Sequence, residues 1–328
     1  MFSGFRRGAA AAAAVAAAGL ALTACSTTGS DDAAGSGETI TVTTDSGTVE
    51  VPKDPQRVVV LDNTAAETVA AFDVTPAAVP KQLFSGKQLG DWTNDEAVKD
   101  VGTHNEPKFD VIEDVNPDLI IGGYRFSKYT DELKKIADAS GGAFIDVAAG
   151  DDARGTRVEA MMRQTKVLGE IFGKQDQAEE IVSVFLEKLD AAKNAARDKT
   201  VFLANVNGGK IDNGAKRLSP LVEPLGLKDV FAGDAGDIHQ NSGLTPEAIA
   251  QANPDWVIVM DRDAAVAKDG ESPTPAAAVF DAQDAFEKTS FMTKKHIIYL
   301  DPQFYLREGI QGYGESYEKI AQAMGSGA

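Results

Sequence analysis

The repeat that decides the fold reads DVIEDVNPDLIIGGYR at residues 110–125 and EAIAQANPDWVIVMDR at residues 247–262, with no gap and a constant offset of 137. In each copy the residues before Asn-Pro-Asp fit a short helix, and the apolar run after it fits a buried strand. Proline disfavours helix at the preceding asparagine, so the helix should end there. Because a helix followed at once by a buried strand is half of a parallel α/β unit, two copies predict two similar lobes.

Shorter apolar segments supply the other expected strands. Residues 57–61 (RVVVL) and 200–206 (TVFLANV) have the pattern of buried strands that open each lobe. Later strands are expected at 144–147 and 297–300. The alternating residues 39–51, with a Ser-Gly pair, predict a small hairpin.

A single long helix is expected between the lobes. Apolar residues recur at helical spacing between residues 175 and 197, with no glycine or proline. These residues are Ala178, Ile181, Val182, Phe185, Leu189 and Ala192. We therefore predict an α/β fold with two Rossmann-like lobes, each a parallel central sheet flanked by helices, joined by one long backbone helix, with a ligand cleft between the lobes. The expected ranges are 39–173 for the N-terminal lobe, 174–198 for the connecting helix and 199–328 for the C-terminal lobe.

The first residues predict an exported lipoprotein. A basic start and an apolar stretch at 9–22 precede Cys25, the only cysteine, and this stretch is shorter than the roughly 20 residues of a membrane-spanning helix. The Leu-Thr-Ala-Cys sequence that ends at Cys25 resembles the bacterial lipobox, which implies a signal peptide at 1–24 and lipidation of Cys25. Residues 25–38 are small, polar and acidic, a composition typical of a flexible tether.

The charge of the chain is strongly negative. Removal of residues 1–24 takes away two arginines and no acid, so the net charge changes from -18 to -20. Such a surface repels nucleic acid. An anionic ligand would therefore need a local cluster of arginine or lysine side chains.

The whole mature chain resembles the substrate-binding lipoproteins of bacterial ABC importers, in the helical-backbone class that carries ferric siderophores, haem and cobalamin. Three sequence segments carry this resemblance: PQRVVVLD at 55–62, VGT at 101–103 and PDLII at 117–121. The resemblance implies an ABC permease and its ATPase as partners, a lipid anchor in the membrane, and a monomer with no cofactor of its own and no catalytic activity.

The second lobe is similar to the branch that binds ferric catecholate siderophores. The matching segments are NGGKI at 207–211, Arg217, His239, Asp261-Arg262, YLDP at 299–302 and Tyr305-Leu306. The resemblance implies that Arg125, Arg217 and Arg262 surround the catecholates, and that His239 and Tyr305 ligate iron when the siderophore leaves two positions open. The chemistry agrees, because guanidinium groups stay charged when desolvated and donate forked hydrogen bonds to anionic oxygens.

Alternatives exist for several of these positions. Lys216 competes with its neighbour Arg217, and Phe304 or Tyr313 with Tyr305. The alternative histidine is His104, whereas His296 is expected at a strand edge. The cargo could instead be haem, cobalamin, a hydroxamate siderophore or a bare divalent metal. A lipid-anchored hydrolase is disfavoured, because the chain has no G-x-S-x-G, H-E-x-x-H or P-loop motif.

Three acids are candidates for docking to the permease. In the family, one acidic residue of each lobe meets arginines of the permease. Asp110 and Glu247 open the two copies of the repeat, and Glu106 is the alternative to Asp110 in the first lobe. An acid at a helix start also complements the helix dipole, so both interpretations stay open.

Overall fold

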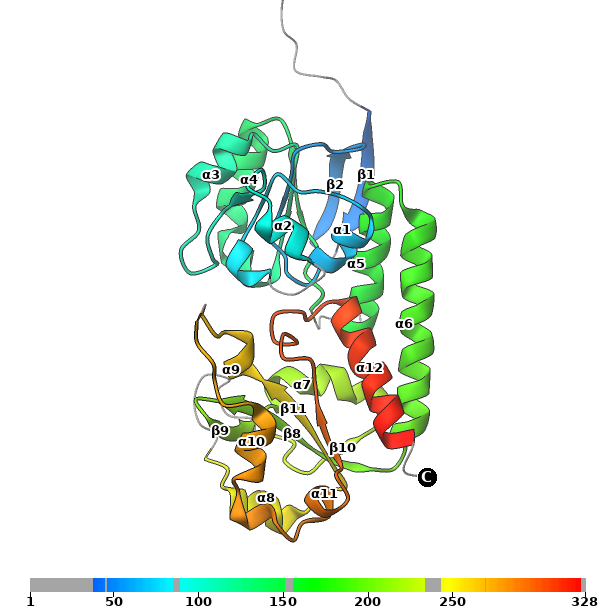
Figure 1. Ribbon diagram of the computed structural model, residues 1–328. Helices are drawn as coiled ribbons and strands as arrows, with labels where there is room; N and C mark the ends of the chain where they lie inside the picture. The colour runs from blue at the N-terminus through cyan, green and yellow to red at the C-terminus, as the bar shows by residue number, and fades with distance from the viewer. Residues whose placement is uncertain are drawn as a thin grey trace, which may run out of the picture. The chain divides into compact units, whose positions relative to one another are not determined.

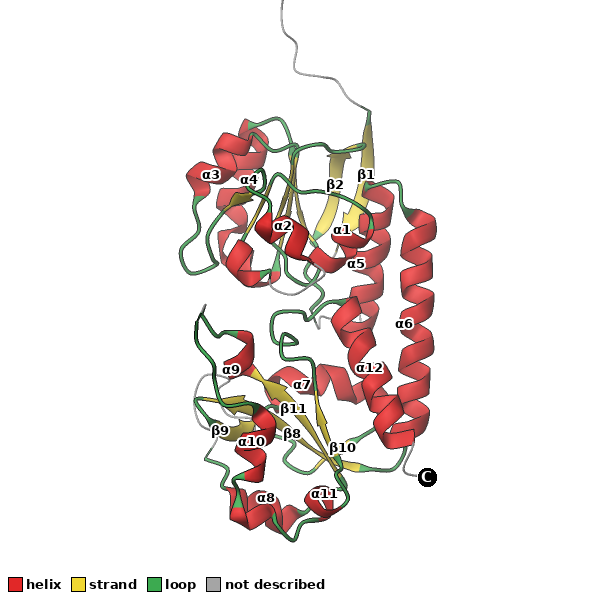
Figure 2. Cartoon of the chain, viewed as in Figure 1, coloured by secondary structure: helices red, strands yellow, loops and turns green. Residues whose placement is uncertain are grey.

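The computed structural model describes residues 38–44, 46–84, 89–150, 156–233, 243–268 and 270–325. The predicted signal peptide, Cys25, the tether up to residue 37, and His239 lie outside these residues. The described part is an α/β structure in which helices surround two sheets (Figure 2). Within it, no helix has both the length and the apolar character required to cross a membrane.

The first sheet has five parallel strands in the order β5-β4-β3-β6-β7. Their bounds are β3 (Val58–Val60), β4 (Ala78–Val79), β5 (Lys99–Asp100), β6 (Leu119–Gly122) and β7 (Ala143–Asp146). Alternate residues of a strand enter different cores: Leu119 and Ile121 pack on one face of the sheet, and Ile120 packs on the other. This two-residue period, with both faces buried, explains why the strands read as continuous apolar runs.

The second sheet repeats this design with one addition. Strands β10-β8-β11-β12 are parallel, and β9 pairs antiparallel with β8. Their bounds are β8 (Thr200–Asn207), β9 (Lys210–Asn213), β10 (Lys228–Asp229), β11 (Trp256–Asp261) and β12 (Ile297–Tyr299). Here too, Ile258 enters one core and Val257 and Val259 enter the other. The predicted fold class is therefore confirmed.

The sequence repeat corresponds to equivalent turns in the two lobes. Helices α3 (Phe109–Val115) and α8 (Pro246–Ala252) end at Asn116 and Asn253, whose φ angles of 50° and 41° lie in the left-handed region. The aspartate two residues later then bonds to the backbone at the start of a neighbouring strand of the sheet. Asp118 accepts the backbone N–H of Arg57 at 2.8 Å, and Asp255 accepts that of Thr200 at 2.8 Å. Asn-Pro-Asp thus ends a helix and fixes the start of a neighbouring strand.

The long helix α6 (Gln175–Ala196) packs against the cores of both lobes. Its Ala178 belongs to the core of the first sheet, whereas Val182, Phe185 and Leu189 belong to the core of the second. The C-terminal helix α12 (Ile310–Gly325) lies beside it, as Figure 1 shows in red and green. The predicted hairpin is also present as β1 (Thr39–Thr44) and β2 (Gly47–Pro52).

The remaining helices are shorter than α6 and α12, and they cover the sheets or connect their strands. They are α1 (Ala66–Ala71), η1 (Lys81–Leu83), α2 (Gly90–Asn94), η3 (Tyr124–Tyr129), α4 (Thr130–Ala139), α5 (Arg157–Ile171), α7 (Ala215–Val222), η4 (Glu223–Leu225), α9 (Arg262–Ala265), α10 (Ala276–Asp281), η5 (Asp284–Phe286) and α11 (Ser290–Thr293).

A return segment at residues 301–309, between β12 and α12, brings the second lobe back to the first. Asn63 donates a hydrogen bond to the Leu306 carbonyl at 2.8 Å, and Arg307 pairs with Glu67 of α1 at 2.6 Å. At Gly309 a Cβ atom would lie 2.2 Å from the Thr64 carbonyl oxygen, so only glycine permits this approach. The return segment is therefore fixed between the two lobes.

Candidate ligand-binding cavity

A cavity of about 690 Å³ is lined by residues that follow strands of both sheets. Its lining residues are Leu83, His104, Asn105, Tyr124, Arg125, Arg157, Lys216, Arg217, Pro220, Arg262, Val266, Tyr305, Leu306 and Glu308. The structure thus brings together Arg125, Arg217, Arg262 and Tyr305, the predicted ligand-binding residues that it describes. Their roles in binding stay predictions.

The topology explains why Arg125 and Arg262 meet here. Arg125 lies in η3, just after β6, and Arg262 begins α9, directly after β11. These are equivalent positions of the repeat, and both follow the carboxyl end of a parallel strand, where open α/β sheets bind ligands. Arg217 comes from α7.

The ring of Tyr305 is the point on which the three guanidinium groups converge. The guanidinium carbons of Arg125 and Arg217 each lie 5.0 Å from the ring centre, and that of Arg262 lies 5.4 Å from it. Burial by itself raises the pKa of the Tyr305 phenol, but the charges of Arg125 and Arg217 outweigh this effect and hold the pKa below its usual value of 10. The cavity therefore favours the phenolate form more than water does.

A buried carboxylate, Glu308, accompanies these cations. Its side chain is only 2% exposed, and its Oε2 atom lies 2.8 Å from Arg217 Nη1 and 3.6 Å from Arg125 Nη2. Tyr124 donates a hydrogen bond to the same oxygen at 2.7 Å. Burial and the Glu308 charge raise the pKa of Tyr124 to about 12, so this phenol stays protonated and remains a donor.

Arg157 adds a further guanidinium to the cavity. It is the first residue of α5, where Thr156 caps the helix through a capping box. Its guanidinium carbon lies 5.5 Å from the Tyr124 ring centre. Although the residue is buried, its Nε and Nη2 atoms have no hydrogen-bond partner in the part of the chain that the structure describes.

The alternative residues separate into cavity and core positions. His104 and Lys216 line the cavity. Burial, with the positive charges of Arg125 and Lys128, lowers the pKa of His104 below its usual value of 6.5, so at neutral pH the ring is uncharged. Phe304 and Tyr313 are buried against each other in the core of the second lobe, with ring centres 5.7 Å apart. His296 stacks on Trp256 instead.

The predicted docking acids are exposed. Asp110 lies in the first turn of α3, Glu247 lies in the first turn of α8, and Glu106 lies in the loop before α3. All three are therefore accessible to a partner. Among the described residues, no three His, Cys, Asp or Glu side chains are grouped so that they could hold a metal ion.

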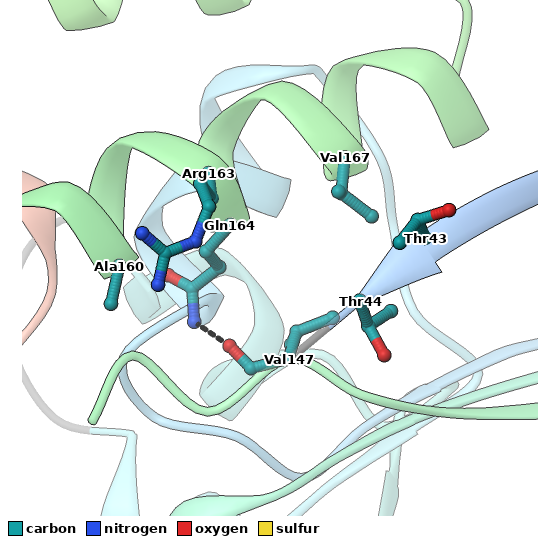
Figure 3. Close-up of a pocket in the computed structure, with 7 residues that line it drawn as sticks. All are labelled: Thr43, Thr44, Val147, Ala160, Arg163, Gln164 and Val167. Atoms are coloured by element: carbon teal, nitrogen blue, oxygen red, sulfur yellow. Dashed lines mark hydrogen bonds between the residues drawn. The ribbon is translucent and has the colours of Figure 1, made fainter. Parts of the chain in front are cut away.

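A second cavity, shown in Figure 3, has a volume of only about 20 Å³. It lies between β1 and α5, and the Gln164 amide beside it donates a hydrogen bond to the Val147 carbonyl at 2.6 Å. This volume is about that needed for a single water molecule. It excludes this cavity as the site of a siderophore-sized ligand.

Tyr124, Arg157 and Glu308 were not predicted as site residues from the sequence. One signal was available for Glu308: it follows Arg307 in an Arg-Glu-Gly sequence three residues after Tyr305, in a segment already assigned to the site. Tyr124 directly precedes Arg125. For Arg157 no pattern distinguishes the residue from an ordinary arginine at a helix start.

The fold and the site define a two-lobed α/β binding protein with an arginine-rich cavity. The chain belongs to the periplasmic binding protein family, whose sequence model matches residues 58–304. It is 29% identical to the petrobactin-binding protein YclQ of Bacillus subtilis over 271 residues, which are 81% of this chain and 80% of YclQ. The ferric-anguibactin-binding protein FatB of Vibrio anguillarum is 27% identical over 222 residues, 66% of this chain and 67% of FatB.

Solved structures agree with these relatives. The crystal structure of YclQ matches with a TM-score of 0.74 at 26% identity and covers 88% of this chain and 99% of the YclQ chain. The periplasmic catecholate-siderophore binding protein VctP of Vibrio cholerae matches with a TM-score of 0.73 at 25% identity, over 86% of this chain and 99% of VctP.

Proposed function

We propose that this protein captures a ferric siderophore of the catecholate type and delivers it to an ABC permease. The observation that carries the proposal is the convergence of Arg125, Arg217 and Arg262 on Tyr305 inside one cavity. The relatives support it: YclQ is a petrobactin-binding protein, FatB is a ferric-anguibactin-binding protein and VctP is a catecholate-siderophore binding protein.

The charge and size of the cavity suit such a ligand. A ferric catecholate complex stays anionic after iron is bound, and arginine matches the geometry of its oxygens. The volume of about 690 Å³ lies within the roughly 300–1,000 Å³ of typical small-molecule sites. A less anionic cargo, such as a hydroxamate complex or cobalamin, would leave most of the arginine charge unbalanced, because Glu308 supplies only one negative charge among four arginines.

The remaining steps of the proposed pathway involve the surface and the N-terminus. Lipidation of Cys25 would hold the protein on the extracytoplasmic face of the cell membrane, and Asp110 or Glu106, with Glu247, would contact the permease. The protein itself would act as a monomeric carrier that catalyses no reaction and needs no cofactor of its own.

A titration of purified protein against a ferric catecholate, a ferric hydroxamate, haem and cobalamin tests the function. Because neither Trp92 nor Trp256 lines the cavity, binding is best followed by calorimetry rather than by tryptophan quenching alone. We expect tight binding of the ferric catecholate and much weaker binding of the other three. Tight binding of only haem or cobalamin would overturn the proposed cargo.

Tyr305 and His239 are the proposed iron ligands for a siderophore with four donor oxygens, and His104 is the alternative histidine because it lines the cavity. We expect Tyr305→Phe to remove the phenolate-to-iron charge-transfer band from the spectrum of such a complex and to weaken its binding about tenfold. Ligation releases the phenol proton, so wild-type affinity should fall as the pH falls, and Tyr305→Phe should reduce this dependence.

Tyr124→Phe is the matched control for this spectrum, because Tyr124 lines the same cavity but stays protonated. The band should persist in that variant. Direct ligation by Tyr305 is wrong if the band is unchanged in Tyr305→Phe. It is also wrong if Tyr124→Phe and Tyr305→Phe change the spectrum equally.

A further inference from the structure

Glu308 places a negative charge inside a cavity that is otherwise built for anions. We propose that Glu308 is a specificity-determining residue that favours ferric complexes of low negative charge and disfavours trianionic ones. This inference rests on the proposed function and names the class of ferric complex that the cavity accepts.

The contacts of Glu308 show that it competes for the same cations as the ligand. Its carboxylate is paired with Arg217 and lies near Arg125, and both of these arginines also face the ring of Tyr305. Any anionic oxygen that approaches them must share them with Glu308 or displace it. Its 2% exposure leaves the carboxylate little solvent to turn into.

The other two arginines of the cavity are arranged differently. Arg262 donates a hydrogen bond at 2.8 Å to Asn207, which is a neutral acceptor. Arg157 has two nitrogen atoms, Nε and Nη2, without a hydrogen-bond partner among the described residues. The cavity therefore contains four guanidiniums and one built-in carboxylate. Glu308 pairs with Arg217, lies near Arg125 and helps to raise the pKa of Arg157 through its charge, so the capacity of the cavity for further negative charge is reduced.

Electrostatics makes this competition depend on the charge of the ligand. Fe³⁺ with three doubly deprotonated catecholates is a trianion, whereas Fe³⁺ with two is a monoanion with two open coordination positions. Repulsion by a fixed carboxylate scales with the ligand charge, and the low dielectric of a buried site strengthens it. Glu308 thus penalises the trianion most, and the favoured monoanion is the complex whose open positions Tyr305 and a histidine can fill.

The test compares a hexadentate ferric tris-catecholamide with a tetradentate ferric bis-catecholamide by calorimetry. The measured quantity is the affinity for the trianionic complex divided by the affinity for the monoanionic complex. We expect Glu308→Gln to raise this ratio about tenfold. Glu308→Asp keeps the charge, so it should keep a ratio of affinities close to that of the unmodified protein. This second variant separates the effect of charge from any disturbance of packing.

Glu318→Gln is the matched control, because it removes one negative charge from an ion pair with Lys188 that is half-exposed and outside the cavity. Its affinity ratio should stay unchanged. An unchanged ratio in Glu308→Gln, or an equal loss of affinity for both complexes, would overturn the assignment while leaving the proposed function intact. If the unmodified protein binds neither complex, the proposed function and the assignment fall together.

Discussion

Arg217→Ala is expected to weaken the binding of a ferric catecholate complex by about a hundredfold or more. Two effects act in the same direction. The ligand loses a charged hydrogen-bond donor, which contributes roughly 1.5–3 kcal/mol. In addition, Glu308 loses its 2.8 Å cation and keeps only Arg125 at 3.6 Å and the Tyr124 hydrogen bond, so more of its buried negative charge repels the anion. A hundredfold change corresponds to about 2.7 kcal/mol, so the two effects together reach it easily.

The double variant Arg217→Ala/Glu308→Gln separates these effects. It lacks the donor but also lacks the buried carboxylate, so it should bind more tightly than Arg217→Ala alone. Calorimetric titration of the unmodified protein, the two single variants and the double variant forms a double-mutant cycle. This cycle gives the coupling free energy between Arg217 and Glu308. Arg197→Gln, at the exposed end of α6, is the control for loss of one arginine and should bind normally. Equal affinities of Arg197→Gln and Arg217→Ala would contradict the role of Arg217.

The fold was predictable from the sequence because its signals are local. The apolar runs at 119–121 and 256–260 are buried strands, and Asn-Pro-Asp ends a helix in both lobes. Each of these patterns depends on residues that are neighbours in the chain. The repeat then placed Arg125 and Arg262 at equivalent strand ends without any knowledge of tertiary contacts.

The network inside the cavity was not predictable in the same way. Tyr124 and Glu308 are separated by 184 residues yet form a 2.7 Å hydrogen bond. The return segment that carries Glu308 is positioned by contacts with residues 63–67 of the other lobe. No local pattern reports such a contact, because it arises only when both lobes are folded. A buried acid among arginines therefore looks, in the sequence, like any other charged surface residue.

The same return segment should dominate the stability of the connection between the lobes. Arg307, with a side chain only 5% exposed, pairs with Glu67 at 2.6 Å and forms a forked ion pair with Glu315 of α12 at 2.8 and 2.9 Å. Arg307→Ala leaves the buried Glu67 without its cation. Breaking a buried ion pair on one side costs about 3–5 kcal/mol, and we expect a loss of this size in the free energy of unfolding, measured by urea denaturation.

The pH dependence of this loss gives it a recognisable signature. Burial raises the pKa of Glu67 above its usual 4.5, and Arg307 opposes this rise. Without Arg307 the pKa should rise further, so the folded variant binds a proton that the unfolded chain has released. Stability is then lost as the pH rises through this range. The deficit against wild type should therefore be smaller at mildly acidic pH than at neutral pH.

Glu67→Gln tests whether the buried charge is the cause. In the double variant Arg307→Ala/Glu67→Gln no uncompensated carboxylate remains, so part of the lost stability should return and its pH dependence should weaken. Lys188→Ala serves as the control, because its ion pair with Glu318 is partly exposed and such pairs contribute only about 0–1 kcal/mol. A loss in Arg307→Ala no larger than that in Lys188→Ala would show that the lobes are held by packing of α6 and α12, with no essential part for this ion pair.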